Sequence, residues 1–104
     1  MDYLRELTAK VRLLQGCKAV HVKTVPVTEV FRGKVAWDGE VEVFDLTGHA
    51  KAKRCYAWGF LRDTRRNELE VVAVLEIPPV DSPESAVRVA IASHARVRGS
   101  IPPH

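Results

Sequence analysis

A chain of 104 residues, 46 % hydrophobic and 28 % charged, has the size and composition of one globular domain. Sixteen Lys and Arg against thirteen Asp and Glu give a net charge of +3, which permits an anionic partner without demanding one. No apolar stretch approaches the roughly 20 residues that span a bilayer, and the N-terminus Met-Asp-Tyr-Leu-Arg-Glu does not look like a signal peptide. We therefore expect a cytoplasmic protein without a membrane partner.

The first predicted element is an amphipathic helix over Tyr3–Gln15. Asp2 can accept hydrogen bonds from the free N–H groups of the first turn, and Gly16 can adopt the left-handed conformation that ends a helix. Apolar residues at spacings of three and four form one stripe, namely Leu4, Leu7, Val11 and Leu14. This stripe predicts the face of the helix that packs on the rest of the protein.

Alternation of valines with polar residues predicts a strand over Ala19–Val25. Pro26 cannot donate to a sheet ladder, so the strand either ends there or lies at a sheet edge. Residues 27–37 fit a short strand and turn, or one helical turn, and the sequence leaves both open. Asp38-Gly39 indicates a tight turn, because glycine accepts positive φ without steric cost.

Three further strands are predicted over Glu40–Leu46, Lys51–Leu61 and Leu69–Ile77. The connections between them have hairpin lengths, so these strands should form an antiparallel meander. After Pro78-Pro79, Ser82 can cap a second helix and Pro83 suits its first position.

The expected fold is α+β with the order α-β-β-β-β-α. It is a two-layer sandwich, in which an antiparallel sheet of about four strands carries the N-terminal and the C-terminal helix on one face. Residues 1–98 form the single domain, and residues 99–104 are a flexible C-terminal tail.

The faces of the sheet follow from the register of its hairpins. A four-residue turn places Val43 opposite Arg54, with Asp45 diagonal to Arg54 as an ion-pair partner. Pairing Leu61 with Leu69 then gives two apolar faces. The face expected under both helices joins small residues to larger ones, namely Cys55, Ala57, Gly59, Leu69, Val71, Ala73, Leu75 and Ile77. The opposite face carries Val41, Val43, Tyr56, Trp58, Val72 and Val74.

An alternative register is also open. Because the connection before Leu69 can shift by one residue, every side chain of the last strand could move to the other face. Both sets of apolar residues would then form one ordinary core, and little apolar surface would stay exposed.

On the two-sided register, the aromatic face needs a cover, and a second copy of the chain is the simplest one. The favoured hypothesis is thus a small soluble interaction or binding domain that works as a homodimer. Its ligand or interface residues are Arg54, Tyr56, Trp58, Phe60, Val72 and Val74. A small molecule or peptide bound near Arg54, Tyr56 and Trp58 is a variant of this hypothesis.

A second hypothesis comes from basic residues that flank alternating aromatics. Rings that stack on bases and cations that hold phosphates are typical of nucleic-acid binding. The contact residues would be Lys51, Lys53, Arg54, Arg62, Arg65 and Arg66. This reading is not favoured, because the neighbouring Glu40 and Glu42 would repel a nucleic-acid backbone.

A third hypothesis is an enzyme whose active site forms between two protomers. Cys55 is the candidate nucleophile, but its predicted side faces the helices, where a thiol is inert packing. Cys17 and Cys55 read as two buried, reduced thiols. The sequence contains no Cys-x-x-Cys or His-Glu-x-x-His pattern and no glycine-rich phosphate loop, so we expect no metal and no cofactor.

Overall fold

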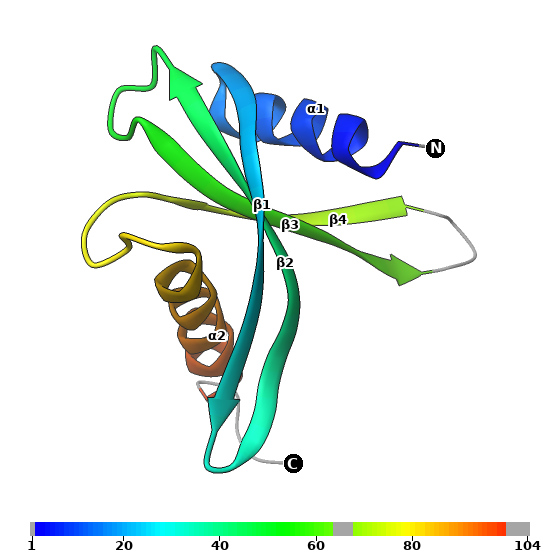
Figure 1. Ribbon diagram of the computed structural model, residues 1–104, viewed down its shortest axis with the longest axis vertical. Helices are drawn as coiled ribbons and strands as arrows, with labels where there is room; N and C mark the ends of the chain where they lie inside the picture. The colour runs from blue at the N-terminus through cyan, green and yellow to red at the C-terminus, as the bar shows by residue number, and fades with distance from the viewer. Residues whose placement is uncertain (1, 64–67, 100–104) are drawn as a thin grey trace.

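The computed structural model describes residues 2–63 and 68–99. In chain order it has a helix, four strands and a helix, which confirms the α+β class and the predicted order (Figure 1). The strands form one antiparallel sheet in the order β1-β2-β3-β4, so the predicted meander is confirmed and extended by one strand.

Helix α1 spans Tyr3–Gln15, as predicted. The Asp2 carboxylate accepts hydrogen bonds from the backbone N–H groups of Leu4 and Arg5 at 3.1 and 3.3 Å. Gly16 follows in the left-handed conformation, with φ of 64°. Both ends of the helix are therefore set by the residues that the sequence singles out.

Strand β1 spans Lys18–Phe31 and β2 spans Lys34–Thr47, so residues 27–37 are strand on both sides of a turn. Pro26 lies within β1, which is an edge strand of the sheet. The edge position predicted as one option for Pro26 is thereby confirmed.

The turn between β1 and β2 is at Arg32-Gly33, and both residues have positive φ, 54° and 76°. This is the backbone of a two-residue type I′ hairpin turn. The turn predicted at Asp38-Gly39 is wrong, because Gly39 lies inside β2, opposite Val27. Glycine serves a packing purpose there: a Cβ at Gly39 would come within 3.0 Å of the Trp37 indole.

Strand β3 spans Arg54–Asp63 and β4 spans Glu68–Leu75. Leu61 pairs with Leu69, which confirms the register of the two-sided sheet and excludes the single-core alternative. The predicted register between β2 and β3, with Val43 opposite Arg54, is wrong by two residues. The connecting loop spans residues 48–53, and Val43 pairs with Tyr56. A shift of two residues keeps every side chain on its predicted face.

The two helices lie on opposite faces of the sheet, so their predicted placement on one face is wrong (Figure 1). On one face, Leu7 and Val11 of α1 pack in a cluster with Cys55 and Ala57 of β3. On the other, α2 (Pro83–Gly99) covers the aromatic side chains of β3. Both faces of the sheet carry apolar side chains, and one helix of the chain packs on each face.

Helix α2 begins at Pro83, and Ser82 accepts a hydrogen bond from the Ser85 N–H at 3.1 Å, which confirms the predicted cap. Gly99 is the last residue of this helix, not part of a tail. The remainder of the predicted C-terminal tail, residues 100–104, lies outside the described residues.

The turn supplies a test of the hairpin. Arg32→Asn should raise the free energy of unfolding by about 0.5 kcal/mol, because Asn tolerates the left-handed region better than Arg. Gly33→Ala should lower it by about 1 kcal/mol, because alanine is strained at positive φ. Urea denaturation followed by circular dichroism measures both, and equal effects of the two substitutions would contradict the assigned turn.

Candidate functional site

Two of the three aromatic residues predicted to form an open face, Tyr56 and Trp58, are buried in the core, whereas Phe60 is 49 % exposed. Tyr56 is 2 % exposed and Trp58 is 6 % exposed. They pack in one cluster with Ala86 and Val87 of α2, and Val72 and Val74 are partly buried against it. The prediction that this face is open to a ligand or a second copy is wrong, because α2 already covers it.

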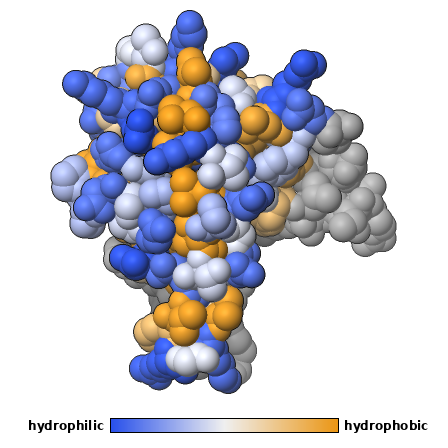
Figure 2. Space-filling model, viewed as in Figure 1, coloured by the Kyte–Doolittle hydropathy of each residue, from blue (hydrophilic) through white to orange (hydrophobic). Residues whose placement is uncertain are grey.

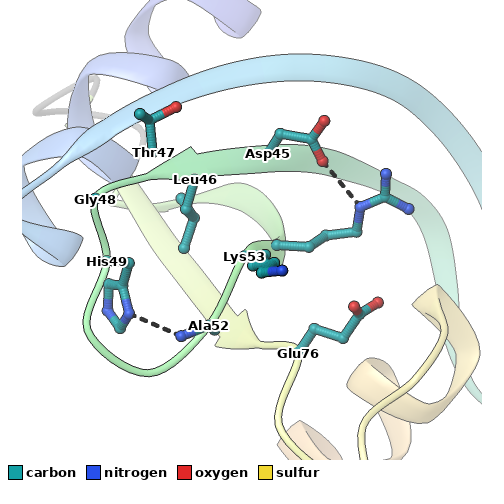
Figure 3. A pocket seen from close by; sticks show the side chains of 9 residues that line it. Asp45, Leu46, Thr47, Gly48, His49, Ala52, Lys53 and Glu76 are labelled. Carbon is teal, nitrogen blue, oxygen red and sulfur yellow. Dashed lines mark hydrogen bonds and ion pairs between the residues drawn. The ribbon is translucent and has the colours of Figure 1, made fainter.

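Arg54 lies at a different place, in an open polar pocket of about 670 Å³ beside the β2–β3 loop (Figure 3). Its Nε donates to the Asp45 carboxylate at 3.0 Å, from the position directly opposite in the ladder. The predicted Asp45–Arg54 ion pair is confirmed. Glu76 lines the same pocket, where its negative charge favours the charged form of Arg54, and its carboxylate accepts a hydrogen bond from the Tyr56 hydroxyl. The cation of Arg54 thus interacts electrostatically with two carboxylates.

The surroundings of Tyr56 and Arg54 shift the pKa values of both groups upward. Burial raises the pKa of Tyr56 above its usual range, and the hydrogen bond to Glu76 raises it further. The hydrogen bond to Asp45 raises the pKa of Arg54. The phenol therefore stays neutral and the guanidinium stays charged at any physiological pH. Neither group is suited to exchange protons with a substrate.

His49 lines the same pocket from the β2–β3 loop and forms hydrogen bonds within that loop. Its Nδ1 accepts hydrogen bonds from the backbone N–H groups of Lys51 and Ala52 at 3.0 and 3.1 Å. Figure 3 shows the bond from Ala52. Because both donors are backbone N–H groups, Nδ1 is unprotonated and the ring proton is on Nε2. The imidazole acts as a local turn-forming acceptor.

Only part of the predicted nucleic-acid surface can be located. Lys51 and Lys53 are exposed on the β2–β3 loop. The side chain of Arg62, and residues Arg65 and Arg66 as a whole, lie outside the described part of the chain. The carboxylates of Asp45 and Glu76 line the same pocket as Lys53. The placed cations are therefore interspersed with acidic groups, and nucleic-acid binding stays a prediction.

A second surface was missed by the sequence analysis: an apolar groove of about 600 Å³ between α2 and the hairpin arm. We define the hairpin arm as residues 27–39, and we call the concavity the arm groove. Val30, Phe31 and Ala36 line it from the arm, and Ile91 and Ala92 line it from α2. At its rim, Arg88 donates to Glu29 at 2.8 Å, which ties α2 to the arm.

The end of the arm exposes large apolar side chains. Val30 is 61 % exposed, Phe31 66 % and Val35 63 %. Figure 2 shows apolar atoms gathered near the lower end of the molecule, with polar atoms at the very tip. The sequence did carry a signal for this surface, since Val30 and Val35 flank an Arg-Gly pair that can form a hairpin turn.

Cys17 and Cys55 are both free, and the first is half-buried while the second is buried. Burial raises the pKa of Cys55 to about 12, and the nearby Cys17 adds to the shift. A thiol in that state is not a nucleophile at neutral pH, so the structure gives no support to Cys55 as a catalytic residue. Among residues 2–63 and 68–99, no three His, Cys, Asp or Glu side chains come together in a way that could hold a metal ion.

Comparison with known proteins adds no assignment. No protein-family model, no curated protein and no solved structure matches this chain. Within the described residues, no helix has both the length and the apolar character needed to cross a membrane.

The two thiols should differ in reactivity. At pH 8, raising the pKa of a thiol from about 9 to about 12 lowers its thiolate fraction roughly a thousandfold. Iodoacetamide should therefore alkylate Cys17 of the folded protein at least 100-fold faster than Cys55, as measured by peptide mass spectrometry. Both should react readily in 6 M guanidinium chloride, which serves as the control. Equal rates in the folded protein would contradict the placement of Cys55.

Proposed function

We propose that this chain is a small interaction domain that self-associates through the arm groove. The observation that carries the proposal is the exposure of Val30, Phe31 and Val35 beside a concave apolar surface. Large apolar side chains gathered on an exposed surface are typical of interaction sites. This retains the homodimer expected from the sequence and moves its interface away from Trp58.

A second copy fits this surface because the surface has two complementary parts. The end of the hairpin arm extends beyond the other strands (Figure 1), and the groove lies along its side. In an antiparallel pair about a two-fold axis, Phe31 of each copy would enter the groove of the other. Such an isologous contact buries both apolar parts at once.

The charges agree with this arrangement. The tip carries Arg32 and Lys34, and no described carboxylate pairs with either. Glu84 precedes Arg88 by one turn of α2, so the two residues lie on the same side of the helix. With two copies antiparallel, the basic tip of one lies beside Glu84 of the other, which favours the pairing.

The edge of β1 is a poorer interface. Arg12 donates from Nε to the Ala19 carbonyl at 3.0 Å, which occupies an acceptor that an added strand would need. A bulge follows at Val22, and Pro26 lacks an N–H. Natural proteins use such devices to prevent edge-to-edge pairing. We therefore place the contact on the arm and α2, not on the strand edge.

The two free thiols are typical of a reducing compartment, and on that ground we propose a cytoplasmic location.

Sedimentation equilibrium between about 1 and 500 µM tests the proposal. The unaltered chain should change from monomer to dimer over this range. Phe31→Asp should weaken dimerisation at least tenfold without loss of thermal stability, because the side chain is exposed in the monomer. Leu13→Asp is the matched control, since Leu13 is 82 % exposed on α1, away from the groove, and should have no effect.

A charge reversal tests the orientation of the two copies. Arg32→Glu alone and Glu84→Lys alone should each weaken the dimer, and the two substitutions together should restore it. A monomer at every concentration, or loss of the dimer through Leu13→Asp but not Phe31→Asp, would refute the proposed interface.

A further inference from the structure

The sheet contains a fork at which aromatic side chains of α1, β2 and β3 meet. β2 pairs with β3 only from Glu42–Ala57 to Asp45–Arg54. Beyond Glu42, β2 continues into the hairpin arm with β1, whereas β3 continues with β4. Figure 1 shows the two pairs of strands pointing in different directions from the centre of the sheet. We call the space between them the fork.

The fork holds a pocket of about 430 Å³ whose walls are aromatic. Both tryptophans of the chain, Trp37 and Trp58, line it together with Tyr3 and Phe60. The two indoles meet edge to face, with ring centroids 5.3 Å apart and planes at 61°. Phe60 is 49 % exposed and Tyr3 is 41 % exposed, so part of the aromatic wall is open to a ligand.

Tyr3 is fixed in place by the divergence of the strands. The backbone N–H of Gly59 has no partner on β2 there, and it donates to the Tyr3 hydroxyl at 2.8 Å. This contact joins the first turn of α1 to β3. The aromatic wall is thus built from three separate elements of the fold and held by a hydrogen bond, which gives the pocket a defined shape.

The charged residues of the fork are acidic. Asp38 and Glu40 line the pocket, and none of its described lining residues is Lys, Arg or His. Asp38 accepts a hydrogen bond from Thr28 at 2.8 Å, while Glu40 has no partner among the described residues. Burial raises the pKa of Tyr3, and the charges of Glu42 and Glu40 raise it further, which agrees with a negative potential at this place.

We propose that the fork binds a methylated ammonium group. Aromatic rings attract cations through their negative faces, and tryptophan is the strongest of them. A primary ammonium is strongly hydrated and binds poorly to such walls, whereas a methylated one gives up little hydration and fills an apolar pocket. Asp38 and Glu40 supply the countercharge at the rim. The group could belong to a free quaternary ammonium compound or to a methylated lysine side chain of a partner.

This inference uses residues different from those of the proposed dimer, and either can fail without the other. The two tryptophans then have two roles, because they pack in or against the α2-side core and also line the fork.

Tryptophan fluorescence reports on the fork, because both tryptophans of the chain line it. The whole chain is titrated with choline and with its neutral isostere 3,3-dimethylbutanol. Peptides that contain trimethyllysine or unmodified lysine form a second pair of probes. Choline should bind at least tenfold more tightly than the alcohol, and trimethyllysine at least tenfold more tightly than lysine. Tighter binding of the peptide than of choline identifies a protein partner, and the reverse order identifies a free compound.

Two variants test the residues involved. Phe60→Leu removes a half-exposed ring while it keeps apolar volume, and it should weaken binding of the methylated probes about tenfold. Glu40→Gln removes the free carboxylate and should weaken binding several-fold. Leu13→Ala is the control, because Leu13 is an exposed apolar residue outside both the fork and the arm groove, and its substitution should leave affinity unchanged. Equal affinity for choline and the neutral alcohol, or no binding of any methylated probe, would overturn the proposal.

Discussion

The structure depends on the alternation of side chains along β3. Cys55 and Ala57 point to one face of the sheet, and Tyr56 and Trp58 point to the other. Small residues on the first face leave room for Leu7 and Val11 of α1, whereas the large rings on the second face need the cover that α2 supplies. Since successive residues of a strand point to opposite faces, a slip of one residue would exchange the two sets and remove both cores. One helix on each face is therefore a consequence of this alternation.

A second constraint is the short contact between β2 and β3. Because these strands pair only from Glu42–Ala57 to Asp45–Arg54, the sheet divides into two hairpins beyond that point. One hairpin becomes the arm, whose apolar end stands clear of the other strands. The division also opens the fork, in which the rings of Trp37 and Phe60 lie near carboxylates. The arm groove and the fork thus have the same origin, because the hydrogen-bonded ladder between β2 and β3 is short.

The features that could be predicted from sequence are those that local chemistry determines. Asp2 and Gly16 set the ends of α1, Ser82 sets the start of α2, and the alternation of residues 55–60 and 69–75 gives the correct faces. The predicted strands 51–61 and 69–77 extend beyond β3 at their start and beyond β4 at their end. Asp38-Gly39 misled the turn prediction, because Gly39 is required by the Trp37 ring that packs over it, a contact that no dipeptide pattern reveals.

The side on which α2 packs could not be predicted either, since it depends on the path of the chain between β4 and Pro83. The full set of residues that lines each candidate surface could not be predicted for a similar reason. The sequence predicts Trp58 and Phe60 as ligand or interface residues. The residues that line the fork with them, Tyr3, Trp37 and Glu40, come from elements whose mutual arrangement only the fold determines.

The chain itself covers the aromatic face of its sheet with α2. Nuclear Overhauser spectra of labelled protein test it directly, at a concentration where the chain is monomeric. We expect cross-peaks between the Trp58 ring and the Val87 methyl groups, and between Leu7 and Ala57. Cross-peaks that instead join the Trp58 ring to Leu7 would contradict it, because both helices would then lie on one face.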